Sequence, residues 1–230
     1  MTDSIYLNPT AIIDSDHPRI RSLVASLTAG ITGQPSDQAV ALYNWVRDQI
    51  RYDPYTPFYR AKHYRASYIL EMGRGFCIPK ASLLCAFGRA CGIPSRVGFA
   101  TVRNHMATRQ LIEMLGSDLF SWHGFVEFYL EGRWVKATPA FNIELCRKFN
   151  VLPLAFNGRE DSIFQQYNSD RRQFMEYVEF LGIFADIPVD DILAGWKNTY
   201  GEERVNQWIA DLERSNGDVG RDFIKEEPVE

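Results

Sequence analysis

The sequence predicts an α+β fold in which a buried central helix, beginning at Cys77, packs on an antiparallel sheet, with additional helices toward the C-terminus. Three observations support this prediction. A nearly continuous apolar segment, with signals for a helix start and a helix end, follows Cys77. A β-rich segment beginning at His123 has the pattern of a hairpin. Helical spacing of apolar residues returns between residues 143 and 214.

The central helix is defined by signals at both of its ends. Pro79 would lie in the first turn, where a helix does not need the N–H that proline lacks. Gly92 and Pro94 follow the apolar segment and are typical of a helix end. The positions between these signals are apolar almost all the way round, which predicts a buried helix: Ala81, Leu83, Leu84, Cys85, Ala86, Phe87, Ala90 and Cys91.

The hairpin prediction rests on residues 123–138. Residues 123–130 and 133–138 are rich in aromatic and β-branched side chains, and Glu131-Gly132 between them suits a two-residue turn. Successive strand residues point to opposite faces, so this register places Thr138 diagonal to His123 on one face of the hairpin. We therefore expect the Thr138 hydroxyl within reach of the His123 imidazole.

Cys77 and His123 are the two halves of a thiol–imidazole nucleophile. Only the thiolate attacks carbonyls well, and both a helix N-terminus and a neighbouring imidazolium lower the pKa of a thiol. A cysteine at a helix start and a histidine at a strand start supply both effects, so we expect a lowered pKa for Cys77. The alternative is a buried structural cysteine and a half-buried structural histidine. His105, after another predicted strand, is the second candidate for the base.

Three blocks of sequence carry a resemblance to a known family. They are Gly-Phe-Cys77-Ile-Pro-Lys-Ala-Ser-Leu-Leu, then Arg89-Ala-Cys-Gly-Ile-Pro-Ser-Arg96, then His123-Gly-Phe-Val-Glu-Phe-Tyr-Leu-Glu-Gly-Arg-Trp134-Val. In this order they resemble the core of the transglutaminase-like superfamily, over about residues 36–142. The resemblance implies a papain-like fold in which a catalytic cysteine, histidine and aspartate follow one another along the chain.

The resemblance also implies roles for individual residues. Carried over position by position, it makes Cys77 the nucleophile and His123 the general base. The aspartate of the family follows the tryptophan of the second strand, in the pattern Trp-x-x-x-Asp-Pro. In this chain the pattern reads Trp134-Val-Lys-Ala-Thr138-Pro139, so Thr138 stands where the family has aspartate. Thr138 is therefore our candidate for the third catalytic role.

Two functions from different classes remain open. The first is thiol-dependent acyl transfer or hydrolysis on amide bonds, of the cysteine protease, amidase or transglutaminase type, in which Cys77 forms a thioester and His123 moves the proton. Its substrate would be a peptide, a protein or a small amide. The second is a catalytically weak or silent transglutaminase-like fold that acts as a protein-interaction module. The missing aspartate favours the second function, whereas the intact Cys77 and His123 favour the enzyme. For the third catalytic role, which the family aspartate has, Asn142 and Asp161 are alternatives to Thr138.

The length and composition of the chain indicate how many domains it has and which partners it does not bind. With 230 residues and 46% hydrophobic content, the chain is long enough for a single domain over residues 1–230. Within it we expect the core at about 36–142, a helical extension at 143–214 and a frayed tail at 215–230.

A net charge of −4 without a basic run argues against nucleic-acid binding. The sequence shows neither a signal peptide nor an apolar run of membrane-spanning length, so we expect a cytoplasmic protein without a membrane partner.

Cysteine and histidine spacing argues against disulfides, metals and other cofactors. Cys77 and Cys85 would lie about 12 Å apart along one helix, which is too far for a disulfide. No cysteine pair has the spacing of a zinc motif, the four histidines are scattered, and no calcium-loop pattern is present. We therefore expect catalysis, if any, to use no metal and no other cofactor.

The other segments are predicted mainly to support the site structurally. We expect a strand at residues 95–102 and an aromatic loop at 51–59 that is a candidate wall for a peptide groove. Helices are predicted at residues 18–29, 36–50, 66–71, 143–149, 171–181, 189–199 and 202–214.

Overall fold

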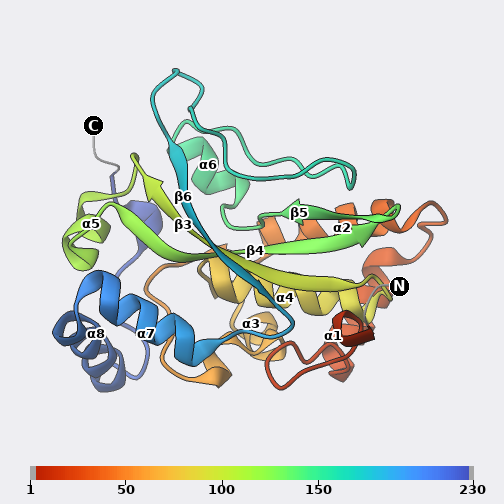
Figure 1. Cartoon of the computed structure of the whole chain (residues 1–230), viewed down its shortest axis with the longest axis horizontal. Helices are drawn as coiled ribbons and strands as arrows, with labels where there is room; N and C mark the ends of the chain where they lie inside the picture. Colours follow the sequence, from red (N-terminus) through yellow and green to blue (C-terminus); the bar gives the residue numbers. More distant parts are fainter. Residues whose placement is uncertain (1–3, 228–230) are drawn as a thin grey trace.

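A four-stranded antiparallel sheet forms the centre of the molecule. The computed structural model describes residues 4–227. The sheet has the strand order β5-β4-β3-β6, and its strands are β3 (Ser95–Asn104), β4 (Leu119–Leu130), β5 (Arg133–Ala137) and β6 (Met175–Phe184). Helix α4 (Cys77–Ala90) lies along one face of this sheet and packs most closely on β4 (Figure 1). The α+β prediction, with a central helix on an antiparallel sheet, is confirmed.

Further helices surround this centre. Helices α1 (Pro18–Thr28), α2 (Pro35–Gln49) and α3 (Ala66–Met72) all pack against α4. Helix α6 (Ile143–Lys148) begins beside the end of α2, where the Ile143 N–H donates to the Asp48 carboxylate. Helices α5 (Arg109–Leu115), α7 (Val189–Tyr200) and α8 (Glu202–Arg214) gather at one end of the molecule (Figure 1). The minor elements are β1 (Arg51–Tyr52), β2 (Arg74–Gly75) and the 3-10 helices Ser4–Tyr6, Ala61–Tyr64 and Phe223–Lys225.

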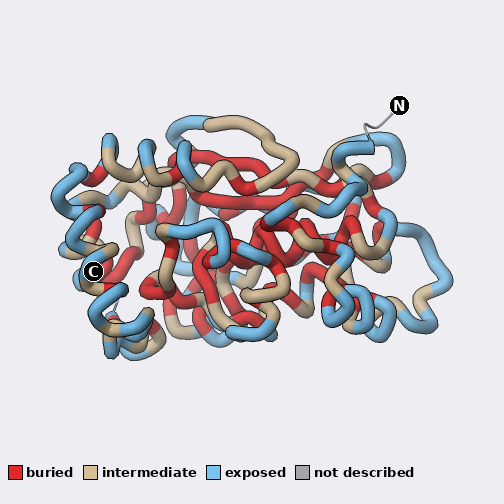
Figure 2. Tube along the Cα trace, turned by 90° about the horizontal axis from the view of Figure 1, so that it is seen from below, coloured by how far each residue is buried: buried red, intermediate tan, exposed pale blue. Residues whose placement is uncertain are grey.

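Helix α4 is buried over nearly its whole length. Every residue from position 78 to position 89 is buried, and Figure 2 shows the buried parts of the chain gathered in the middle of the molecule. Pro79 lies in the first turn, and Gly92, with a φ of +79°, follows the end of the helix as expected. The all-round apolar pattern therefore gave the position of this helix correctly, because a helix that is apolar on every side must be surrounded.

One buried polar cluster ties α2, α4 and the chain after β5 together. The Lys80 side chain is fully buried, and its Nζ donates to the carbonyl oxygens of Arg47 and Ile50 at the end of α2. Asn142 Nδ2 donates to the same two carbonyls, while its Oδ1 accepts a hydrogen bond from the Tyr52 N–H. Burial holds the pKa of Lys80 well below its usual range. These bonds satisfy helix-end carbonyls that would otherwise be buried without partners.

The β4–β5 hairpin forms in the predicted register. Leu130 pairs with Arg133, and the pairing continues to Val126 and Ala137. The turn residues Glu131 and Gly132 have φ values of +49° and +86°, as a tight two-residue hairpin turn requires.

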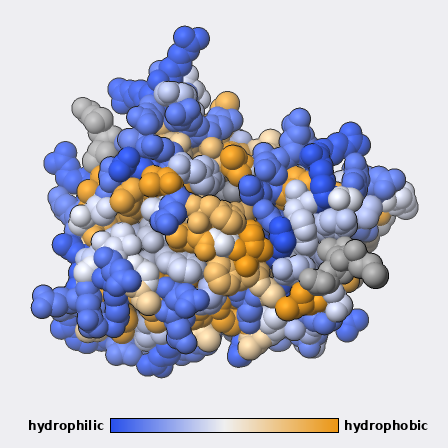
Figure 3. All heavy atoms as spheres, viewed as in Figure 1, coloured by the Kyte–Doolittle hydropathy of each residue, from blue (hydrophilic) through white to orange (hydrophobic). Residues whose placement is uncertain are grey.

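Strand β6 corrects one sequence prediction. Residues 171–181 were expected to form a helix, yet Met175–Phe184 pairs with β3 as the fourth strand of the sheet. Without β6 the second edge of β3 would be left unpaired, and such long-range pairing overrides a local pattern. β6 is itself an edge strand and leaves Val178 and Phe180 exposed. Figure 3 shows apolar surface in the middle of the face over which β6 runs.

The other predicted elements lie where expected, with two differences. Helices α1, α2, α3, α6, α7 and α8 and strand β3 agree with the predicted ranges to within about two residues, whereas α5 was not predicted.

The end of the chain was expected to fray. Instead, Phe223 is buried, and the Glu226 carboxylate accepts hydrogen bonds of 2.6 Å from both the Tyr55 and the Thr108 hydroxyls. Residues 228–230 of the predicted tail lie outside the described residues. Among residues 4–227, no helix combines the length and the apolar character that a membrane crossing requires.

Strand β4 comes very close to the first turn of α4 at Gly124. A Cβ atom on Gly124 would lie 3.1 Å from the Ile78 Cα and 3.5 Å from the Ile78 backbone nitrogen. Glycine inside a strand often marks such a close backbone approach. This contact sets the distance between the residue before Gly124, which is His123, and the residue before Ile78, which is Cys77.

We predict that Gly124→Ala destabilises the protein and displaces the start of α4. The added methyl meets backbone, which yields less readily than a side chain, so we expect a loss of about 1–3 kcal/mol in the free energy of unfolding. Urea unfolding measures this loss. The displaced Cys77 should also change its rate of reaction with a thiol reagent several-fold.

Gly92→Ala is the matched control. Gly92 has open space around it, so alanine there introduces only the strain of a positive φ, and the reactivity of Cys77 should not change. A Gly124→Ala variant with wild-type stability and wild-type thiol reactivity would show that the approach is not tight.

Candidate active site

Cys77 is the first residue of α4, and backbone N–H groups surround its sulfur. The N–H groups of Gly124, Ile78 and Cys77 itself donate toward the thiol, and each of them lowers its pKa. Two of these donors come from the start of α4, where N–H groups have no partner within the helix. The third comes from β4, at the close approach of Gly124. The sequence predicted the helix-start position, whereas the donor from β4 depends on how the strand packs.

The pKa of Cys77 is nevertheless high. Burial raises it to about 11, outweighing the three N–H donors. Cys77 retains partial exposure because a cavity borders it, yet protein atoms enclose the sulfur. Desolvation disfavours the charged thiolate. In the free protein the thiol is therefore protonated at neutral pH, which corrects the lowered pKa that the sequence suggested.

His123 lies on β4 directly before Gly124 and is 5% exposed. Its ring packs on Phe164, with 4.9 Å between the ring centroids. Burial lowers the pKa of His123 to about 3, so the imidazole is neutral at physiological pH. Its Nε2 atom is buried and makes no hydrogen bond within residues 4–227. Such an atom calls for an explanation, since buried polar groups in native proteins are nearly always paired.

An irregularity in β4 precedes His123. The β3–β4 pairing shifts register between Ala100 and Val102, and Trp122 has a φ of +62°, which is unusual for a bulky residue. The Trp122 indole packs on Gly195 of α7, where any side chain at position 195 would collide with it. A β-bulge redirects the side chains around it, so this one helps to set the direction of His123.

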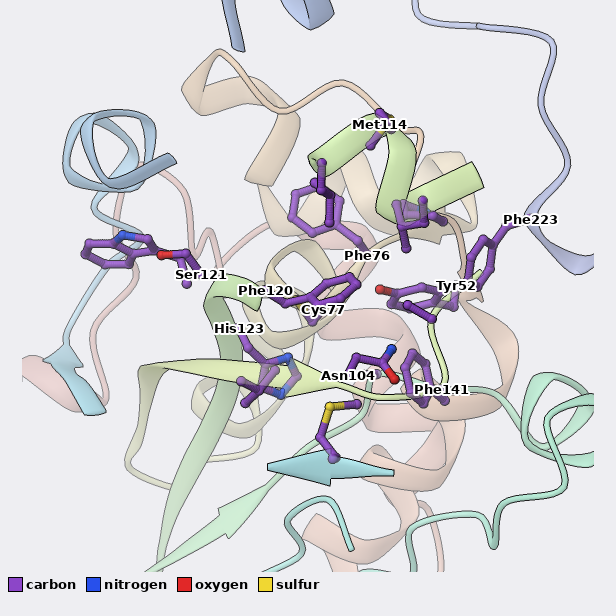
Figure 4. Close-up of a pocket in the computed structure, with 18 of the residues that line it drawn as sticks. Tyr52, Phe76, Cys77, Asn104, Met114, Phe120, Ser121, His123, Phe141 and Phe223 are labelled. Atoms are coloured by element: carbon purple, nitrogen blue, oxygen red, sulfur yellow. The ribbon is translucent and has the colours of Figure 1, made fainter. Parts of the chain in front are cut away.

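Cys77 and His123 both line one cavity. Figure 4 shows Tyr52, Phe76, Phe120 and Asn104 around the same space. The cavity has a volume of about 100 Å³, and its walls come from β3, β4, α4, α5, α7, α8 and the chain near Phe223. The structure thus brings the predicted nucleophile and the predicted base to one cavity.

Thr138, the third predicted residue, is 1% exposed and follows β5. Its Oγ1, like His123 Nε2, is one of five buried side-chain atoms within residues 4–227 that make no hydrogen bond. The nearby Tyr177 hydroxyl interacts with Thr138, an effect that lowers the Tyr177 pKa, although burial raises that pKa overall to about 12. Tyr177 also lies beside His123, at 6.4 Å between ring centroids. Thr138, Tyr177 and the imidazole therefore belong to one neighbourhood.

The alternatives to Thr138 (Asn142 and Asp161) and to His123 (His105) make other contacts. Asn142 uses both ends of its amide in the buried cluster with α2. Asp161 accepts a hydrogen bond from the Lys136 N–H and lies 3.8 Å from the Lys136 ammonium. His105 lies 3.5 Å from Glu176 and does not line the cavity. These contacts give Asn142 and Asp161 structural roles, and His105 is not part of the cavity wall that contains Cys77.

The sequence did not identify the aromatic surroundings of the site. Trp122, Phe164 and Tyr177 contact His123 or fix the backbone beside it, and they come from three separate segments. Trp122 stood next to the predicted base, but nothing in the sequence showed its positive φ. Of the predicted aromatic loop, Tyr52 and Phe58 do line the cavity. Within the described part of the chain, no cluster of three or more His, Cys, Asp or Glu side chains could hold a metal ion.

Comparisons with known proteins give one family match. A family model, the transglutaminase-like superfamily, matches residues 21–139, which is about half of the chain. No curated protein matches the sequence. Among solved structures, a candidate cysteine protease from Cytophaga hutchinsonii is similar with a TM-score of 0.45 and 17% identity, over 78% of this chain and 53% of that chain. The periplasmic domain of TgpA from Pseudomonas aeruginosa has a TM-score of 0.40 and 22% identity, over 58% and 45%. The chain thus spans about half the length of either structure.

The raised pKa of Cys77 predicts how its alkylation depends on pH. With a pKa of about 11, only about one thiol in 10,000 is ionised at pH 7. The rate of Cys77 modification by iodoacetamide should therefore be low at neutral pH and continue to rise between pH 8 and pH 11. Mass spectrometry of the labelled peptide measures this rate.

The control for this profile is His123→Ala. A neutral imidazole places no positive charge near the sulfur, so the pH at which the Cys77 thiol ionises should be the same in the variant as in the wild type. A rate that levels off near pH 6 in the wild type, and loses this plateau in His123→Ala, would instead demonstrate a thiolate–imidazolium pair.

Proposed function

Since this chain belongs to the transglutaminase-like superfamily, we propose that it is a thiol enzyme that transfers or hydrolyses acyl groups at amide bonds. The observation that carries the proposal is the meeting of Cys77 and His123 at one cavity, with three backbone N–H groups near the sulfur. A pure interaction module needs neither a thiol at a buried helix start nor an imidazole beside it. Four free cysteines fit a reducing compartment, and we place the protein in the cytoplasm.

The first step starts from a neutral pair. The Cys77 thiol attacks the amide carbonyl while the neutral His123 accepts its proton, so that charge develops only as the reaction proceeds. The pKa of His123, at about 3, keeps the imidazole in its basic form over the whole physiological range. The N–H groups of Gly124, Ile78 and Cys77 lie near the sulfur and are therefore candidates to stabilise the oxyanion on the attacked carbonyl.

The second step releases the amine and then the acyl group. The imidazolium returns its proton to the departing nitrogen, which leaves a thioester on Cys77. Water resolves this thioester in hydrolysis, and a second amine resolves it in transamidation. The balance between the two outcomes depends on how far the apolar walls of the cavity keep bulk water from the thioester.

Thr138 is our proposed partner for the imidazole. His123 Nε2 is buried without a hydrogen bond within residues 4–227, and Thr138, which also interacts with the Tyr177 hydroxyl, offers a buried hydroxyl in the same neighbourhood. A neutral hydroxyl fixes the orientation of the ring but stabilises the imidazolium less than aspartate would, because charge-assisted hydrogen bonds are roughly twice as strong. The proposal therefore implies slower turnover than an aspartate would support.

An acyl-enzyme on Cys77 is the expected intermediate. Intact-mass measurement after incubation with a panel of peptide amides and simple amides should reveal an acyl adduct on the wild type. The adduct should be absent in Cys77→Ala and reduced at least about 100-fold in rate in His123→Ala, the usual contribution of a general base. Cys85→Ala is the matched control, since Cys85 lies on the same helix, and it should retain the adduct. An adduct that persists in Cys77→Ala, or no adduct with any amide, would contradict the proposed reaction.

Thr138→Val tests whether Thr138 orients the His123 imidazole. Valine has nearly the volume of threonine but lacks the acceptor, so we expect the rate of acyl-enzyme formation to fall about tenfold, in line with the loss of one hydrogen bond. Thr138→Asp should keep or raise the rate. Asp161→Ala is the control and should be neutral. If Thr138→Val keeps the wild-type rate while Tyr177→Phe lowers it, the orienting hydroxyl belongs to Tyr177.

A further inference from the structure

The cavity beside Cys77 is lined without a single charged side chain among the described residues. Phenylalanine, tryptophan and tyrosine supply thirteen of its twenty-six lining residues, and methionine supplies three more. Apart from Cys77 and His123, the polar side chains at the cavity come from Asn104, Ser121 and the tyrosines. A pocket of this composition favours an apolar group by burying its surface.

Several of the polar groups at the cavity already form hydrogen bonds within the protein. The Tyr200 hydroxyl donates to the Leu119 carbonyl and accepts from the Ser121 N–H. The Trp196 indole N–H donates to the Ser121 carbonyl, and Asn104 Oδ1 accepts from the Met106 N–H. A peptide backbone entering this space would bring N–H and C=O groups that find few partners, which weakens its binding.

The size of the cavity limits the group that it can hold. An apolar cavity of about 150 Å³ accommodates benzene. By proportion, 100 Å³ holds about four carbon atoms. The space therefore suits a short aliphatic chain, and small shifts of the methionine side chains would admit a longer one.

A second, larger cavity adjoins the first. Its volume is about 510 Å³, and the two cavities share Pro54, Phe58, Met114 and Trp208 as common walls. In contrast to the inner cavity, the outer one is also lined by charged residues, including Asp211, Arg214 and Arg221. The two cavities thus form an apolar chamber at Cys77 and an outer chamber that also offers charged side chains, and they share Phe58, Met114 and Trp208 as walls.

Building on the proposed function, we infer that the inner chamber is an acyl pocket, and that the substrate is the amide of a short apolar carboxylic acid with a polar amine. The acyl chain occupies the inner chamber and the amine occupies the outer one. The Cys77 sulfur bonds to the acyl carbon, the C–N bond breaks, and the thiol proton passes through His123 to the departing amine. Water then adds to the thioester, which releases the free acid and restores the thiol.

The first test measures binding without turnover. Cys77→Ala is titrated calorimetrically with the ethanolamides of acetic, butyric and pentanoic acid, with the monoethanolamide of glutaric acid, and with an N-acylated glutaminyl-glycine dipeptide. Affinity should rise about fourfold for each added methylene up to the pentanoyl chain. The glutaric probe should bind at least about 100-fold more weakly than the pentanoyl ethanolamide, because its carboxylate would be buried without a partner. The glutaminyl dipeptide should bind more weakly than the butyryl ethanolamide.

The second test changes the wall between the chambers. Met114→Trp should weaken the pentanoyl ethanolamide at least tenfold while leaving the acetyl ethanolamide nearly unchanged, and Met114→Ala should shift the preference toward longer chains. Met72→Ala is the matched control, since Met72 is an exposed methionine on α3 away from both cavities, and it should leave the order of affinities unchanged.

The two proposals fail in different ways. An affinity that does not change with chain length, a preference for the glutaminyl dipeptide, or Met114 variants with the wild-type order of affinities would overturn the acyl pocket. If the binding order holds and no probe acylates Cys77 in the wild-type protein, the pocket stands and the proposed reaction is overturned.

Discussion

The contact between the backbone of β4 at Gly124 and the first turn of α4 is the constraint on which the candidate site depends. A Cβ on Gly124 would lie within 3.5 Å of two backbone atoms of Ile78, so the strand lies against the start of the helix with no side chain between them. The contact adds a strand N–H to the two helix N–H groups at the Cys77 sulfur. It also fixes His123, one residue earlier in the strand, relative to the thiol. A catalytic pair needs positions held to a fraction of an ångström, and packed backbone provides this better than flexible side chains do.

The apolar walls of the cavity determine the charge state of the pair. The same desolvation raises the pKa of Cys77 to about 11 and lowers that of His123 to about 3. Both residues are therefore neutral in the free protein, and ionisation has to occur together with attack on the substrate. The absence of an aspartate agrees with this arrangement, because a neutral imidazole needs orientation more than it needs a counter-charge. Thr138, buried near His123 and Tyr177, is chemically suited to that role.

The elements around the cavity are held in place by buried polar anchors. Lys80 and Asn142 bind the same carbonyls at the end of α2 and join that helix to α4 and to the chain after β5. At the other end, Glu226 accepts from the Tyr55 and Thr108 hydroxyls, which keeps the C-terminal segment against the site so that Phe223 lines the cavity. Breaking such an anchor leaves buried groups unpaired, which costs more than the bond itself contributes. The final residues of the described chain are thus part of the wall.

The sequence by itself determined the central helix, the hairpin and its register, because helix signals, all-round apolar character and turn residues are local properties. It also supplied Cys77 and His123 as a candidate pair and Thr138 as the residue at the aspartate position. The tertiary structure decided what depends on distant segments. Strand β6 forms because the edge of β3 is available to it, although its residues looked helical, and the C-terminal tail packs because Tyr55 and Thr108 hold Glu226. The pKa of Cys77 moved in the opposite direction to the sequence prediction, because desolvation sums over every neighbour of the sulfur, whereas the sequence shows only the neighbours along the chain.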